Sequence, residues 1–216
     1  MRSMDAPFRC WGDGDPLMAA YHDEEWGVPL RGARQLFAKL ILDGFQAGLS
    51  WAVVLHKRDS LEAAFDGFDP ERMARYDARK IRRLLSDPGI IRNRQKIDAA
   101  IANARAFLDF EEGHGSFDEF LWGFVGGVPQ QRARRSLREL PAKTPASERM
   151  SAALRRHGFR FVGSTICYAF MQAVGMVNDH LLRCFRHPEV RALARAWSSL
   201  HPRPTRGRLR SYPRGR

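Results

Sequence analysis

Four cysteine and histidine residues stand near opposite ends of the chain, at spacings that would allow a metal site. Cys10 and His22 are separated by eleven residues, and His180 and Cys184 are four positions apart. A spacing of four puts both side chains on one face of a helix or helical turn. Two cysteines and two histidines make the composition of a closed tetrahedral zinc site, which is structural because no position remains for a reactive water. On spacing alone, the alternative is a histidine and a small buried cysteine that lie close in sequence by chance.

Such a site would join residue 10 to residue 184 across most of the chain. The entropy lost on closing a loop grows only logarithmically with its length, and zinc binding offsets that loss. The third cysteine, Cys167, has no ligand-type neighbour, so we expect it in the core. A sparse and odd cysteine count does not predict a disulfide framework.

A second feature with chemical potential is a short turn, bounded by two glycines, between two predicted helices. The helices cover residues 149–157 and 164–174, and the turn runs from Gly158 to Gly163. Backbone N–H groups at the start of the second helix lack intrahelical partners and, with the helix dipole, suit a DNA phosphate. The groups concerned are those of Gly163, Ser164 and Thr165. This is the outline of a helix-hairpin-helix element, which grips a duplex without reading its sequence; shape alone favours an ordinary pair of antiparallel helices.

The charge balance favours a polyanionic partner. The 216 residues include 36 Lys and Arg against 24 Asp and Glu, for a net charge of +12. Residues 188–216 carry eight Arg and one Glu, so the excess is concentrated there. Basic surfaces bind nucleic acid by releasing counterions from its phosphates.

Composition indicates a folded soluble protein. Hydrophobic residues make up 44% and charged residues 28% of the chain, which is ordinary for a globular protein. The longest mostly apolar stretches, 37–42 and 166–170, are far shorter than the roughly 20 residues of a membrane-spanning helix. Residues 1–11 contain no apolar segment of the kind found in a secretory signal. We therefore expect a cytoplasmic protein with no membrane partner.

Helical periodicity dominates the chain and predicts the elements that position these residues. The apolar positions recur at helical spacing in three stretches; they are 36–41, 81–85 and 92–110. Asp77, Ser116 and Ser147 are candidate N-caps, and Gly158 is a candidate stop signal. No segment alternates with period two between turn signals, so the fold class is all-α.

Several of these segments together resemble the 3-methyladenine DNA glycosylase I family, within the helix-hairpin-helix glycosylase superfamily. The matching stretches span roughly residues 8–186. They are Arg9–Trp11, Asp15–Leu17, Tyr21–Pro29, Gly44–Trp51, Gly89–Arg92, Phe161–Gln172 and Val177–His180. So many matches in order are far more specific than any single motif.

The resemblance implies a two-lobed helical fold with a base-binding pocket between the lobes. It implies one structural zinc per chain, held by Cys10, His22, His180 and Cys184 and joining the chain ends. The domain organisation that follows is a glycosylase domain over residues 1–187, with lobes interleaved in sequence. Residues 188–216 would then be a basic, flexible C-terminal tail.

The family's pocket maps onto four residues of this chain. By resemblance, Trp51 is the stacking platform, Tyr21 a hydrogen-bonding partner, Trp26 a wall, and Asp43 the acidic residue for base binding and catalysis. From the residues alone, Trp26 and Trp51 are equally well explained as core-filling side chains. Asp43 stands where the family usually has Glu, so the charge is kept while the reach falls by about 1.5 Å. Direct contact with the base is then weaker or mediated by water.

Two substitutions relative to the wider superfamily bear on mechanism. Thr165 stands where bifunctional members carry a lysine, so no amine is available there for Schiff-base strand cleavage. Asn178 stands where the superfamily's catalytic Asp lies, as is typical of this family, and Asp179 is expected to orient His180 or cap a helix.

The leading hypothesis is therefore a monomeric, monofunctional glycosylase that flips out and hydrolytically releases 3-methyladenine from alkylated double-stranded DNA, with free 3-methyladenine as product. The alternative is a zinc-stapled DNA-binding module that senses alkylated bases without catalysis, which the change from Glu to Asp favours. A zinc hydrolase or deaminase is a third reading, and a complete set of four protein ligands argues against it.

Overall fold

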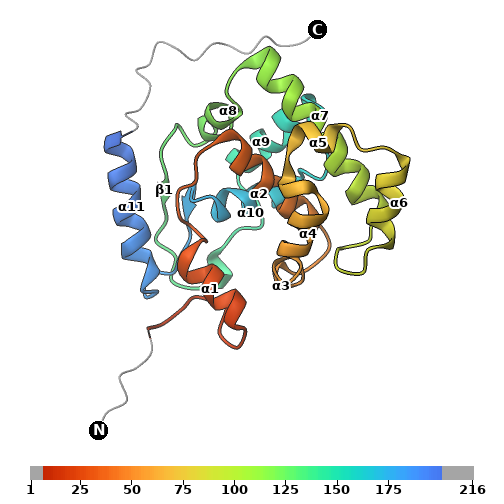
Figure 1. Ribbon diagram of the computed structural model, residues 1–216. Coiled ribbons are helices and arrows are strands. Elements are labelled where there is room, and N and C mark those ends of the chain that lie inside the picture. The colour runs from red at the N-terminus through yellow and green to blue at the C-terminus, as the bar shows by residue number, and fades with distance from the viewer. Residues whose placement is uncertain (1–6, 201–216) are drawn as a thin grey trace.

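The computed structural model describes residues 7–200. Within that range the chain is mostly helical, as the sequence predicted (Figure 1). The α-helices are α1 Pro16–Glu24, α2 Ala33–Gln46, α3 Trp51–Leu55, α4 Arg58–Ala64, α5 Pro70–Ala74, α6 Ala78–Ser86, α7 Arg94–His114, α8 Phe117–Gly123, α9 Pro145–Arg156, α10 Ser164–Ala173 and α11 Arg186–Leu200. Two short 3₁₀ helices cover Asp66–Phe68 and Leu137–Glu139. None of the helices in the described part of the chain is long and apolar enough to cross a membrane.

Helix α2 lies at the centre of the molecule and carries Asp43, the acidic residue predicted for the base pocket. Its apolar positions, Leu36, Phe37, Leu40 and Ile41, are at most 2% exposed. They belong to one core cluster with residues of α7 and α10, and Figure 1 shows α10 beside α2 in the middle of the fold. The prediction of an amphipathic helix in this stretch is confirmed.

Capping residues explain where several helices begin. Asp77 and Ser116 cap α6 and α8, as predicted, by accepting hydrogen bonds from the backbone of Lys80 and Glu119. The prediction of Ser147 as a cap is wrong, because α9 begins three residues earlier. Thr144 is its N-cap, and Thr144 and Ser147 form a reciprocal capping box.

The prediction that the chain contains no strand is wrong for two very short segments. Strands β1, Gln130–Gln131, and β2, Val177–Asn178, pair in parallel, with Gln130 opposite Val177. Two residues are too few to show an alternating pattern, which is why the sequence gives no sign of them. The pairing holds the 128–134 segment against the stretch that leads into His180.

The prediction of a flexible tail beginning at residue 188 is wrong for its first part, because α11 starts at Arg186. Val190 is fully buried, and the Trp197 ring stacks on Trp122 with centroids 4.7 Å apart. Trp197 Nε1 also donates a hydrogen bond to the carbonyl of Gly127. Hydrophobic contacts therefore order this basic segment. Residues 201–216, which hold six of the eight arginines counted there, lie outside the described residues.

Candidate functional site: a base pocket beside a metal-ligand cluster

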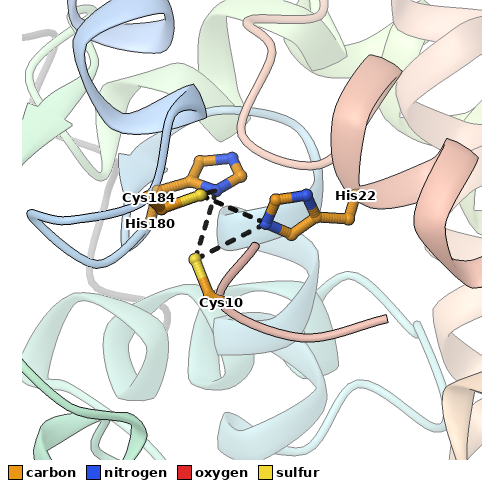
Figure 2. Close-up of side chains that lie close together, drawn as sticks. All are labelled: Cys10, His22, His180 and Cys184. Atoms are coloured by element: carbon orange, nitrogen blue, oxygen red, sulfur yellow. Dashed lines mark hydrogen bonds between the residues drawn. The ribbon is translucent and has the colours of Figure 1, made fainter. Parts of the chain in front are cut away.

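The four predicted metal ligands lie together in the fold. Cys10, His22, His180 and Cys184 are all buried, and their ligand atoms lie within 4.8 Å of one another. Figure 2 shows the two sulfurs and two imidazoles converging on one point. Each sulfur is 3.5 Å from His22 Nε2 and 3.6 Å from His180 Nδ1. This group could hold a metal ion, and it joins the N-terminal segment to the turn before α11.

Other groups fix the orientation of both imidazoles. His22 Nδ1 is 2.8 Å from a carboxylate oxygen of Asp23, and His180 Nε2 is 2.9 Å from the carbonyl oxygen of Trp26. Each ring therefore donates its second N–H away from the cluster and leaves the facing nitrogen as a ligand, which is the usual arrangement around a protein-bound metal. Asp23 was not predicted from the sequence, although a carboxylate next to a ligand histidine is a recognisable sign of a residue that orients the imidazole.

The contact between the two cysteine sulfurs raises the pKa of the Cys10 thiol and favours the thiolate form of Cys184. The backbone N–H of Leu181 donates to the Cys10 sulfur at 3.2 Å. The contact with Cys10, followed by those with His180 and His22, lowers the pKa of the Cys184 thiol. A thiolate is the form of cysteine that binds metals. Cys167 is buried away from the cluster, as predicted, with its thiol 3.4 Å from the Val162 carbonyl.

The roles expected for Asp179 are not observed. Its carboxylate accepts hydrogen bonds from the Tyr168 hydroxyl at 2.5 Å and the Gln172 amide at 2.9 Å, and it forms an ion pair with Arg134. Asn178 positions the ligand instead, because its side-chain oxygen accepts from the backbone N–H of His180. Asn178 therefore takes the orienting role that was expected for Asp179.

Trp26 connects the metal-ligand cluster to the predicted base pocket. Its ring meets that of His180 edge-on at 4.6 Å, and its carbonyl receives the His180 hydrogen bond. The same side chain packs in a cluster with Tyr21, while Trp51 is half-buried against that cluster. Tyr21, next to the ligand His22 on α1, and Trp26 thus connect the predicted pocket to the metal-ligand cluster.

Tyr21 and Trp51, two of the residues predicted for the pocket, lie together in the fold. Tyr21, on α1, is 3% exposed, and its ring lies 5.0 Å from that of Trp51, the first residue of α3. Ser50 caps α3 and so fixes the direction in which Trp51 leaves the backbone. The indole Nε1 of Trp51 is buried and has no hydrogen-bond partner among the described residues.

Asp43 supplies a buried carboxylate to the same place. It is 1% exposed and lies near the end of α2. One oxygen, Oδ1, forms a 2.5 Å ion pair with Lys39, one turn earlier, while the other, Oδ2, has no hydrogen-bond partner within residues 7–200. Burial raises the pKa of Asp43, and the charge of Lys39 opposes that rise. Asp43 Oδ2 and Trp51 Nε1 are thus a buried acceptor and a buried donor without partners among the described residues, whereas such groups are normally paired with protein, water or a ligand.

Lys39 is the pocket residue that the sequence analysis missed. Its ammonium nitrogen lies 4.1 Å from the centroid of the Trp51 ring and 5.9 Å from that of Tyr21. Burial lowers the pKa of Lys39, and the charge of Asp43 opposes this. A signal was present in the sequence, since Lys39 interrupts an otherwise apolar stretch four residues before Asp43.

The predicted hairpin has the expected outline. Helix α9 ends at Arg156 and α10 begins at Ser164, with Gly163 as its N-cap and no side-chain cap. Thr165 is exposed at this end of α10. Phe161, in the turn, has a φ of 54°, which is uncommon for a residue with a bulky side chain. A hollow of about 340 Å³ beside the turn is lined in part by the positively charged side chains of Arg94, Arg105 and Arg160.

The sequence and the fold are similar to those of known glycosylases. The family model described as methyladenine glycosylase matches residues 11–187. The chain is 49% identical over 181 residues to DNA-3-methyladenine glycosylase 1 of Escherichia coli K12, covering 83% of this chain and 97% of the relative. A crystal structure of 3-methyladenine DNA glycosylase I superimposes with a TM-score of 0.82 at 52% identity, over 84% of this chain and all of that one. The Staphylococcus aureus enzyme, studied for 3-methyladenine recognition, gives a TM-score of 0.80 at 35% identity, over 83% of this chain and 95% of that one.

Proposed function

The chain belongs to the methyladenine glycosylase family, and on that premise we propose that it releases 3-methyladenine from alkylated DNA through the pocket of Tyr21, Asp43 and Trp51. The observation that carries this assignment is a buried carboxylate with one oxygen unpartnered among the described residues, whose other oxygen pairs with a cation that lies over the Trp51 ring. A cationic base fits between such groups, because a ring face and a carboxylate both attract positive charge.

The reaction needs little help with bond breaking. Methylation at N3 leaves the adenine of a nucleotide positively charged, so the bond to C1′ breaks readily. The electron pair of that bond passes to the purine, which departs as neutral 3-methyladenine. Water adds to C1′ and loses a proton, which leaves an abasic site. The protein must therefore extrude the nucleotide, select the charged base and admit water.

We assign the following roles to the pocket. Trp51 stacks on the extruded base, Tyr21 and Trp26 close its sides, and Asp43 favours the cationic base over neutral adenine. The same carboxylate stabilises positive charge as it shifts toward the sugar, and this is the catalytic role that we assign to Asp43. Oδ2 is the oxygen of Asp43 that is available to the base, since it has no partner within residues 7–200.

We propose that the metal is a structural zinc, one per chain. Zinc bonds of about 2.3 Å to sulfur and 2.0 Å to nitrogen, at a tetrahedral angle, put the sulfur and nitrogen about 3.5 Å apart. The four sulfur-to-nitrogen distances of 3.5–3.6 Å fit that arrangement. Four protein ligands fill the coordination sphere, so the ion would stabilise the fold beside Trp26 and take no part in base release.

We propose that the hairpin holds the DNA backbone. The N–H groups of Gly163, Ser164 and Thr165 stand at the uncapped start of α10, where the helix dipole favours a phosphate. The arginines near the turn add positive charge. Because Thr165 is not an amine, the enzyme leaves the abasic strand uncut.

One incubation tests this function and the lack of lyase activity. Purified protein is mixed with a methylated duplex, and the products are divided between chromatography for free base and a denaturing gel. We expect free 3-methyladenine, with strand breaks only after alkali. A protein that binds the duplex but releases no base would instead be a sensor without catalysis. Breaks before alkali would contradict the assignment as a monofunctional enzyme.

A further inference from the structure

The base pocket already contains a positive charge that belongs to the protein. Lys39 Nζ lies over the Trp51 ring at 4.1 Å, with the Tyr21 ring at 5.9 Å, and forms a 2.5 Å ion pair with Asp43. A cation between these rings and this carboxylate makes the contacts that the proposed function assigns to the cationic base. The Lys39 side chain is 12% exposed, so the ammonium is largely withdrawn from water.

The ammonium and a stacked purine cannot occupy this ring face together. A purine stacked on Trp51 would lie at van der Waals contact, about 3.5–4.0 Å from the ring, where the nitrogen of Lys39 now lies. Two positive charges in one poorly solvated pocket also repel each other. A purine of either charge that stacks on this face must therefore move the ammonium off the ring, and a cationic purine must also take the place of the ammonium beside Asp43.

The lysine side chain has the means to move. The ammonium stands at the end of a flexible four-carbon stem, whose rotation requires no change in helix α2. Burial lowers the pKa of Lys39, which reflects the poor solvation of the ammonium in its present place and therefore favours its exit when a ligand replaces its contacts. Asp43 Oδ2, unpartnered among the described residues, gives an entering base a first contact while Oδ1 is still paired with Lys39.

We propose that Lys39 is a specificity-determining residue, a built-in cation that competes with the cationic base for Trp51 and Asp43 and leaves the pocket when that base binds. This inference rests on the proposed function for the identity of the base. The competition lowers the affinity for charged bases relative to neutral ones. The pocket of this chain would then discriminate less strongly by charge than the same pocket without a lysine.

The test compares a permanent cation with a neutral base of nearly the same shape. The cation is 3,9-dimethyladeninium, which has no proton to lose at N9, and the neutral ligand is 3-methyladenine. Both are titrated calorimetrically into wild-type protein and into Lys39→Met, which keeps a long side chain without charge. We expect the cation to bind about 3- to 30-fold more tightly to Lys39→Met, because a cation–π contact no longer has to be exchanged. Binding of the neutral base should change less.

Three further variants make the result specific. Lys39→Arg keeps the positive charge and should bind the cation no more tightly than wild type. Lys39→Gln removes the charge but still offers Asp43 a hydrogen bond, so it repeats the test if Lys39→Met is unstable. Lys143→Met removes an exposed lysine that pairs with Glu148 and should change nothing.

A measurement on the wild-type protein does not depend on any variant. We expect the NMR signal of the Lys39 ε-methylene, which lies beside the Trp51 ring, to move to the position of a solvated lysine as 3,9-dimethyladeninium is added. An unmoved signal at saturation, or a cation that binds folded Lys39→Met and Lys39→Gln no better than wild type, would overturn the proposal. Because neither readout uses base release, a catalytically inactive protein with a displaced Lys39 would contradict only the proposed function.

Discussion

At the scale of single residues, the pocket depends on a carboxylate placed where water cannot solvate it. Asp43 is 1% exposed, and burial raises the pKa of its carboxyl. A buried carboxylate is stable as an anion only beside a compensating positive charge. Lys39 supplies that charge in the free protein, and the alkylated base would supply it in the complex. The free energy that the pocket gains from a cation is therefore the basis of its selectivity.

The first prediction separates charge from stacking in this pocket. Asp43→Asn keeps the shape but removes the negative charge, so it should weaken binding of the permanent cation by about 1.5–3 kcal/mol, the usual worth of a hydrogen bond to a charged group. Trp51→Ala should lose about 1–3 kcal/mol through stacking, for charged and neutral bases alike. Calorimetry with both ligands measures the two patterns. Equal binding of the cation to wild type and Asp43→Asn would show that the carboxylate does not recognise the base.

The second prediction concerns a ligand residue. Purified protein should contain about one zinc per chain by elemental analysis. Cys184→Ala removes a ligand that binds through sulfur, and it should lower the melting temperature and the zinc content together, because zinc binding contributes to folding. Single-turnover base release at a temperature where the variant is folded should fall much less than the zinc content does.

Cys167→Ala is the matched control, since it removes a buried thiol away from the cluster and should leave the zinc content unchanged. Metal-free wild-type protein with an unchanged melting temperature would contradict a structural zinc.

Single residues also show how far sequence reasoning reaches. Cys10, His22, His180 and Cys184 were predicted from their spacing together with the family resemblance, because metal coordination restricts residue types strongly. The orienting role of Asn178 was not predictable, since Asn178 and Asp179 can both accept a hydrogen bond and only the turn decides which one receives the backbone N–H of His180. Lys39 was missed because one charge in an apolar helix is ordinarily explained by a surface position.

At the scale of elements, the metal-ligand cluster and helix α11 support each other. The helix begins at Arg186, two residues after Cys184, so the ligands fix the place from which it starts. In turn, His187 and Val190 are buried against the fold, and His187 Nε2 lies 3.1 Å from the carbonyl of Arg132. A basic composition predicted a flexible tail here, but the apolar positions among the arginines bury enough surface to order the helix. Local charge is therefore a weak predictor of flexibility where a few hydrophobic side chains are buried against the fold.

The third prediction follows from the far end of α11. Trp197 stacks on Trp122, and the guanidinium of Arg31 lies 5.0 Å from the Trp197 ring. Trp197→Ala should reduce the free energy of unfolding by about 1–3 kcal/mol, less than a fully buried tryptophan would, because the ring is only half-buried. Chemical denaturation measures the change, and Trp197→Phe should recover part of it. A variant as stable as wild type would mean that α11 docks without this contact.

At the scale of the whole molecule, positive charge is distributed so that binding to DNA and recognition of the base are separate tasks. The pocket pairs its single lysine with a carboxylate, whereas the net charge of +12 resides elsewhere. Arg94, Arg105 and Arg160 line a hollow beside the hairpin, and residues 201–216 carry six arginines and no acidic residue. General attraction to phosphates therefore depends on groups that do not contact the base.

The last prediction tests that separation by shortening the chain at a position that leaves α11 intact. Ending the chain after His187 would remove α11 with its buried Val190, and the loss of stability would obscure any effect on DNA binding. Ending it after Leu200 removes six arginines and keeps the helix. Each phosphate that the shortened chain no longer neutralises should reduce the log–log slope of affinity against salt by roughly 0.9, and we expect a few such phosphates. Binding to damaged and undamaged duplexes should weaken alike, while base release at saturating DNA stays nearly constant.

Replacing the six arginines with lysines in the full chain keeps the charge and should preserve the slope. Superimposable slopes for the truncated and full-length proteins would mean that residues 201–216 make no contribution to DNA binding.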